Sequence, residues 1–133
     1  MSFKLLCALV LLSASCVNAM QIQADCNFRT KTVYSEGKFP KATTTRVLNC
    51  SITRFDNNNQ KWSLSSRGLR DGYAFGCDSN DWFCFEMDPN QPNWTSGYAC
   101  NKKVTVWDNN MQTKSCGDDC TTIYNKVVYN IDC

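Results

Sequence analysis

The sequence contains no histidine. Histidine is the usual general base at neutral pH, the base of Ser-His-Asp and Cys-His nucleophile systems, and a common metal ligand. Its absence excludes those catalytic systems, and it excludes secreted ribonucleases that work with a pair of histidines. We therefore expect a protein that is not an enzyme and that carries no metal or cofactor.

Long apolar runs are scarce as well. One clear run covers Leu5–Val17, directly after the basic Lys4, and Val17-Asn18-Ala19 places small residues where a signal peptidase reads. This pattern is typical of a secretory signal peptide that is cut after Ala19. No later run reaches the roughly 20 apolar residues that a membrane helix needs. We expect a signal peptide at residues 1–19, a single secreted, extracellular domain at residues 20–133, and no membrane partner.

Cysteine motifs for zinc or redox chemistry are missing too. The chain has no Cys-x-x-Cys motif, and three residues separate the thiols of Cys116 and Cys120 in "CGDDC". An even number of cysteines in a short secreted chain predicts a disulfide framework. The eight cysteines that follow the leader are Cys26, Cys50, Cys77, Cys84, Cys100, Cys116, Cys120 and Cys133. We expect four bridges, and one between Cys26 and Cys133 would hold both chain ends.

A helical stripe is absent from every segment of ten or more residues. Ser115 and Asp118 fit the Ser-x-x-Asp capping pattern, which predicts one short helix near residue 116. Cys116 and Cys120 would then lie on one face of that helix and point at neighbouring strands.

Period-two alternation predicts strands in the rest of the chain. Apolar and polar residues alternate in Leu48–Thr53 and again in Trp62–Ser65, and turn-forming residues at Asp56–Gln60 separate them. This arrangement predicts a β-hairpin. Further strands are expected at residues 82–88, 104–107 and 126–133, with a second hairpin turn at residues 108–110. The predicted fold class is mainly β, a small disulfide-stapled sandwich or barrel with one short helix.

A cluster of charge of one sign is also missing. Residues 20–70 carry nine Lys and Arg against three Asp and Glu, whereas residues 71–133 carry four against nine. The basic residues are scattered along the first half, which favours a solvated surface of mixed charge. We expect a monomer with no nucleic-acid partner.

Carboxylates are the acid–base groups that remain. Glu86 and Asp88 lie two residues apart beside Trp82, and a glycosidase needs two carboxylates flanking a sugar. The same two residues also fit the exposed side of a strand. Four aspartates, Asp78, Asp81, Asp118 and Asp119, could gather around calcium. "DSNDW" does not continue into the calcium-loop pattern, so we assign no metal ligands.

Two sequons and several aromatic residues suggest surface roles. Asn49-Cys50-Ser51 and Asn93-Trp94-Thr95 are acceptors for N-glycosylation, and the loop position of Asn93 favours it over Asn49. Aromatic residues in or near turns are Trp62, Trp94, Tyr98 and Trp107. Such residues stack on sugars or anchor protein partners. We take Trp94 and Trp62 as binding candidates and expect Trp94 to be exposed.

The layout as a whole resembles the small secreted cysteine-rich proteins of filamentous fungi, which include effectors. The features that carry the resemblance are the leader ending "VNA", about 114 further residues with eight cysteines, the end segments "ADC" and "NIDC", and the lack of histidine. The resemblance implies a virulence effector that recognises a host extracellular protein.

Three functions are therefore open. The first is a secreted, non-catalytic binding protein whose partner is a protein outside the producing cell. The alternative is a carbohydrate-binding module for cell-wall polysaccharide, chitin or glucan. The second alternative is a hydrolase that uses Glu86 and Asp88.

Overall fold

The computed structural model describes residues 19–107 and 110–133, which form nine β-strands. Residues 1–18 of the expected signal peptide lie outside the described residues. The strands are β1 (Ala19–Tyr34), β2 (Ala42–Arg54), β3 (Gln60–Arg67), β4 (Ala74–Cys77), β5 (Cys84–Met87), β6 (Trp94–Ala99), β7 (Lys102–Trp107), β8 (Asn110–Gly117) and β9 (Cys120–Asp132).

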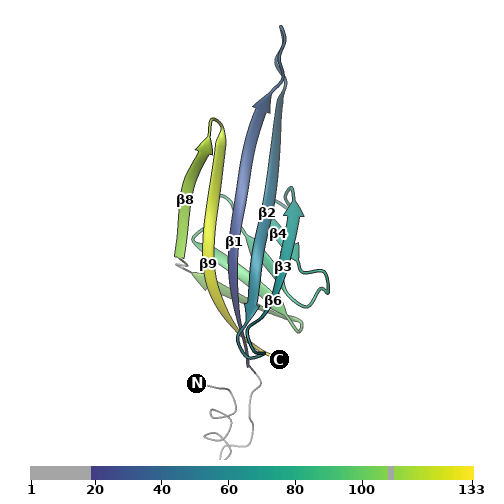
Figure 1. Ribbon diagram of the computed structural model, residues 1–133, viewed down its shortest axis with the longest axis vertical. Helices are drawn as coiled ribbons and strands as arrows, with labels where there is room; N and C mark the ends of the chain where they lie inside the picture. The colour runs from purple at the N-terminus through teal and green to yellow at the C-terminus, as the bar shows by residue number, and fades with distance from the viewer. Residues whose placement is uncertain (1–18, 108–109) are drawn as a thin grey trace, which may run out of the picture.

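The strands form two antiparallel sheets that pack as a sandwich. The five-stranded sheet has the order β3-β2-β1-β9-β8, and the four-stranded sheet has the order β4-β5-β6-β7. In Figure 1 the strands of the smaller sheet cross behind the lower part of the larger one. Strand β1 lies in the centre of the larger sheet, where it pairs with β2 on one side and with β9 on the other. The predicted mainly β fold, a sandwich or a barrel, is therefore confirmed as a sandwich.

Alternation along the strands builds the core between the sheets. Every second residue of β1 from Ile22 to Phe28 is buried, and so is every second residue of β9 from Val127 to Ile131. The other buried apolar residues that meet them include Leu48, Ile52, Leu64, Phe83, Phe85 and Met87. This pattern confirms the strands and the β2–β3 hairpin that the alternation predicted.

Gly97 of β6 allows the two sheets to approach closely. A Cβ atom built at this position would lie 2.9 Å from the ring of Tyr129 and 3.1 Å from the ring of Phe83. The next inward residue, Thr95, forms a hydrogen bond with the Tyr129 hydroxyl across the sandwich. Residues 95 and 97 of β6 therefore point inward.

The short helix that we expected near residue 116 is wrong. Cys116, Asp118 and Asp119 lie at the turn of the β8–β9 hairpin, where Gly117 and Asp119 have φ angles of 127° and 50°. Cys116 and Cys120 are bonded to each other across this turn instead of to neighbouring strands. The Ser115 hydroxyl accepts a hydrogen bond from the Gly117 N–H, so it supports a tight turn instead of a helix start.

The second hairpin, expected around residues 108–110, is also wrong. Asp108 and Asn109 lie outside the described residues, but β7 before them pairs with β6, and β8 after them pairs with β9. The chain thus passes from one sheet to the other at this point. Turn-forming residues mark a change of direction, and they do not specify which strand becomes the partner.

The eight cysteines among the described residues form the predicted four bridges, but the Cys26–Cys133 pairing was wrong. Strand β9 runs antiparallel to β1, so its end at Asp132 pairs with Ala19, seven residues from Cys26. That offset is roughly 23 Å along a strand, whereas bridged Cα atoms lie within about 7 Å. Cys26 instead bonds to Cys50, its direct partner in the β1–β2 register.

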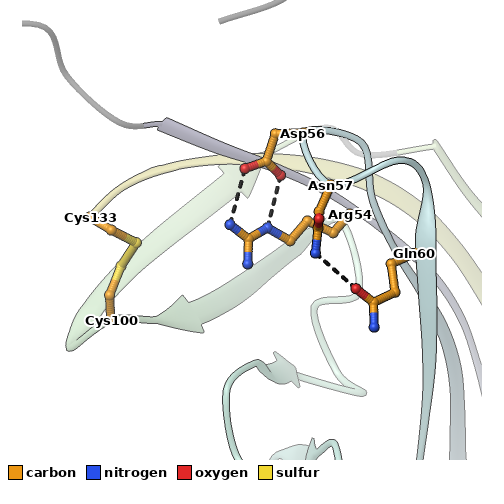
Figure 2. Close-up of polar contacts among 6 residues, drawn as sticks. All are labelled: Arg54, Asp56, Asn57, Gln60, Cys100 and Cys133. Carbon is orange, nitrogen blue, oxygen red and sulfur yellow. Dashed lines mark hydrogen bonds and ion pairs between the residues drawn. A yellow bond between two sulfur atoms is a disulfide. The ribbon is translucent and has the colours of Figure 1, made fainter.

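Of the two further bridges that involve the smaller sheet, one joins two of its strands and the other joins one of its turns to Cys133. Cys77 bonds to Cys84, its direct partner across β4 and β5. Cys100, in the β6–β7 turn, bonds to Cys133. Figure 2 shows this terminal bridge near the β2–β3 turn, where the Arg54 guanidinium donates two hydrogen bonds to the Asp56 carboxylate. In the same turn the Asn57 amide donates to the side-chain carbonyl of Gln60 at 2.8 Å.

We expect the terminal bridge to stabilise the fold more than the hairpin bridge. Cys100 and Cys133 are 33 residues apart, whereas Cys116 and Cys120 are four apart. In the chain-entropy account this difference is worth about 2 kcal/mol. Urea unfolding should therefore show a larger loss of stability for Cys100→Ala with Cys133→Ala than for Cys116→Ala with Cys120→Ala. Equal losses, or the reverse order, would contradict this account.

Stability should also fall in alkali because of Tyr129. Burial raises the pKa of the Tyr129 hydroxyl well above its ordinary value of 10.0, against a smaller opposite effect of the Thr95 hydrogen bond. Above about pH 10 the unfolded chain releases this proton and the folded protein retains it. Stability should then decline as pH rises further, by up to about 1.4 kcal/mol per pH unit.

Thermal unfolding between pH 8 and pH 11.5 tests this expectation. The Tyr129→Phe variant should start less stable, because Thr95 loses its partner, but it should decline less steeply above pH 10. Tyr124→Phe is the matched control, because this ring is 43% exposed. An unchanged slope in Tyr129→Phe would show that another group causes the alkaline loss.

Candidate functional site: an aromatic outer face

The outer surface of the four-stranded sheet carries a group of aromatic side chains. Because Thr95 and Gly97 point into the core, the alternating residues Trp94, Ser96 and Tyr98 point away from it. The register places Trp107 of β7 opposite Trp94. We define the aromatic face by five side chains, which are Tyr73, Phe75, Trp94, Tyr98 and Trp107.

The rings of the aromatic face contact one another in two groups. Trp94 lies between Tyr73 and Trp107, with ring centroids 5.9 Å and 6.1 Å away. Phe75 and Tyr98 form a second pair at 6.1 Å. Trp107 is 62% exposed, and the other four rings are partly buried. All five rings of the aromatic face therefore reach solvent, Trp107 most of all.

Charged side chains border the rings. The Arg70 guanidinium lies 4.3 Å from the centroid of Phe75. The Glu86 carboxylate accepts a hydrogen bond from the Tyr98 hydroxyl at 3.0 Å and lies 3.7 Å from the Lys103 ammonium. Burial raises the pKa of Tyr98, and Glu86 acts in the same direction, whereas the hydrogen bond with Lys103 lowers it. The hydroxyl is therefore neutral at physiological pH and can donate.

Two hollows border Tyr98, one beside the aromatic face and one that extends to Met20 and Arg54 of the larger sheet. The smaller, about 380 Å³, is lined by Arg70, Asp71, Tyr73, Phe75, Cys84, Glu86 and Tyr98. The larger, about 830 Å³, is lined by residues that include Trp82, Cys84, Tyr98, Lys103 and Cys133. Because both include Cys84 and Tyr98, they meet at these residues. Both hollows are open to solvent, and their lining combines apolar surface with a few polar groups.

The outer surface of the larger sheet is different. The outward residues of β1 are polar, including Gln21, Gln23, Asp25 and Asn27, and Asn49 lies opposite Asn27 on β2. Two apolar side chains of β9, Tyr124 and Val128, are exposed on the same surface, which is otherwise polar, as is typical of an antiparallel sheet with one solvated side. The asymmetry makes the aromatic face the better candidate site.

The two predicted binding residues do not lie together. Trp94 belongs to the aromatic face, but it is partly buried in β6 instead of exposed in a loop. Trp62 lies on β3 of the other sheet, where it packs against the core and contacts the ring of Trp82 at 4.6 Å. Tyr73 and Phe75 were not predicted as binding residues, although their period-two spacing just before Gly76 indicates one face of a strand.

The candidate carboxylates have structural contacts. Glu86 is held by Tyr98 and Lys103, as described above, and the Asp88 carboxylate accepts a hydrogen bond from the Asn90 N–H in the β5–β6 loop. Both carboxylates therefore have partners within the sheet and the neighbouring loop.

The four aspartates considered for calcium are divided between two loops. Asp78 and Asp81 lie in the β4–β5 loop, and Asp118 and Asp119 lie in the β8–β9 turn. The Asp78 carboxylate is buried and accepts hydrogen bonds from the N–H groups of Phe83 and Asn80. Among the described residues, no group of three or more acidic or cysteine side chains could hold a metal ion.

Comparisons with family models, with curated proteins and with solved structures found no match to this chain. Evidence for its cellular location therefore comes from its own disulfides and secondary structure. Four intramolecular disulfides are typical of extracellular or secreted proteins. Within residues 19–107 and 110–133 no helix is long and apolar enough to span a membrane.

The acceptor asparagines of both sequons are exposed, and we expect Asn93 to carry the glycan. Asn93 lies in the β5–β6 loop, whereas the middle residue of the Asn49 sequon, Cys50, is buried in a disulfide. When the chain is expressed in a eukaryotic secretory host, Asn93→Gln should abolish the mobility shift caused by peptide-N-glycosidase, and Asn49→Gln should preserve it. The reverse pattern would contradict this assignment.

Proposed function

We propose that this protein is a secreted, non-catalytic binding protein that recognises a saccharide chain through its aromatic face. The observation that carries the proposal is the gathering of five aromatic rings on the outer side of one sheet, beside hollows with charged rims. The apolar faces of sugar rings pack on aromatic rings, and sugar hydroxyls form hydrogen bonds with charged and polar side chains around them.

The tilt of the rings indicates the form of the saccharide. The contacting rings are inclined to one another by 61° for Tyr73–Trp94, 47° for Trp94–Trp107 and 67° for Phe75–Tyr98. Rings at such angles cannot all lie flat on one plane. We therefore expect a single soluble chain, of chitin or β-glucan type, to bind better than a flat crystalline surface.

The proposal includes secretion of the protein and a role in binding without catalysis. A signal peptide at residues 1–19 would deliver the chain to an oxidising compartment, and four bridges suit a protein that works outside the cell. Glu86 and Asp88 already hold neighbouring groups of the sheet and loop. We therefore assign binding and not hydrolysis to this site.

Recognition of a host extracellular protein is the second candidate. Trp, Tyr and Arg dominate the binding energy of protein interfaces, and the aromatic face together with Arg70 has this composition. This candidate would make the protein an effector, as the resemblance of its layout implies.

Affinity electrophoresis with soluble chitin and β-glucan oligosaccharides tests the first candidate. The protein is first treated to remove N-glycans, because a glycan at Asn93 lies next to Trp94. Trp107→Ala and Trp94→Ala should each weaken binding roughly tenfold, equivalent to about 1.4 kcal/mol. Tyr124→Ala is the control, because this exposed ring lies on the other sheet.

The outcome separates the two candidates. Binding that is lost in both tryptophan variants and kept in the control supports saccharide recognition. If no saccharide is retained, the first candidate fails. Capture of a host protein that depends on the same two tryptophans would then make the second candidate the working function.

A further inference from the structure

The β1–β2 hairpin extends beyond the sandwich as an arm, which we define as residues 32–46. Pairing of β1 with β9 ends at Lys31, and pairing of β2 with β3 ends at Val47. Beyond these points the two strands pair only with each other, as far as Tyr34 and Ala42. Figure 1 shows the arm rising past every other turn at the top of the molecule.

The tip of the arm carries exposed apolar side chains. Phe39 is 87% exposed, Tyr34 is 56% exposed and Val33 is 54% exposed, and these are three of the four most exposed large hydrophobic residues in the described chain. The turn that presents them is fixed by two hydrogen bonds between Ser35 and Lys41, of 2.9 and 2.8 Å. The fold gains no burial from this tip, so its apolar residues require another explanation.

Positive charge accompanies the apolar tip. The arm contains Lys38, Lys41 and Arg46 against the single acidic residue Glu36, which gives a net charge of +2. The nearest acidic turn, at Asp119, contacts the base of the arm, where its carbonyl accepts a hydrogen bond from the Thr32 N–H. The two lysines, Lys38 and Lys41, directly flank Phe39 and Pro40.

We propose that the tip of the arm binds an anionic lipid surface, with Phe39 inserted among the lipids and Lys38 and Lys41 at the headgroups. A stable protein interface buries about 800 Å² on each partner and needs a matching concave surface. A narrow convex tip with an apolar apex and cationic flanks instead fits a planar anionic surface. This proposal revises the expectation of no membrane partner, which rested on the lack of a spanning segment and does not address surface binding.

Flotation of the oxidised protein with lipid vesicles tests the proposal. Vesicles of phosphatidylcholine with about 30% phosphatidylserine should bind the protein, and vesicles of phosphatidylcholine alone should bind it at least tenfold more weakly, because each lysine near an anionic surface contributes roughly fivefold. Binding should weaken between 0.1 M and 1 M NaCl, because the Debye length falls from about 10 Å to about 3 Å.

Four variants assign the binding to the tip. Phe39→Ser, and Lys38→Glu combined with Lys41→Glu, should each reduce vesicle binding at least tenfold. Phe55→Ser and Lys61→Glu are the matched controls. Phe55, which is 38% exposed, and Lys61 lie at the β2–β3 turn, at the end of β2 that is far from the arm. All five substituted positions are exposed, and equal thermal midpoints confirm that each variant folds.

Two results would overturn the proposal. One is the absence of binding to either vesicle, which would leave the tip as a surface for an acidic protein. The other is equal loss of binding in the tip variants and the controls. Because the arm and the aromatic face share no residue, saccharide binding should be unchanged in Phe39→Ser, so the two proposals succeed or fail separately.

Discussion

The pairing of β1 with both β2 and β9 is the interaction on which the rest of the structure depends. This one strand sets the register of the larger sheet, and its alternation directs Ile22, Ala24, Cys26 and Phe28 into the core. The same register places Cys26 opposite Cys50 and brings the end of β9 beside Ala19. A one-residue slip would turn every one of these side chains to the polar side, so the pattern fixes the pairing strongly.

The local structure was largely predictable from the sequence, and the long-range pairing was not. Alternation predicted the β2–β3 hairpin, the strand around Phe85 and the last strand, because each is a property of a few consecutive residues. The transfer of the chain between sheets after β7, and the partners of Cys26 and Cys133, depend on contacts between segments far apart. Cys116 and Cys120 fit either one helical turn or a closed hairpin, and Gly117 with a positive φ angle belongs to the hairpin.

The candidate site was only partly predictable for the same reason. Trp94 and Trp62 look alike as aromatic residues near turns, but the strand register turns Trp94 outward and Trp62 toward the core. Tyr73, Phe75 and Trp107 become neighbours of Trp94 and Tyr98 only when β4 to β7 form one sheet. The arm and the aromatic face are thus two separate surfaces that one compact core presents, one apolar and basic at a tip, the other aromatic along a sheet.

A two-dimensional NMR titration of ¹⁵N-labelled protein with soluble chitin and β-glucan oligosaccharides tests the central claim most directly. Each of the four tryptophans contributes an indole N–H signal, which reports on its own ring. Recognition through the aromatic face predicts that the signals of Trp94 and Trp107 shift with saturation while that of Trp62 stays in place. Shifts confined to Trp62, or no shift at concentrations where the oligosaccharide binds, would contradict it.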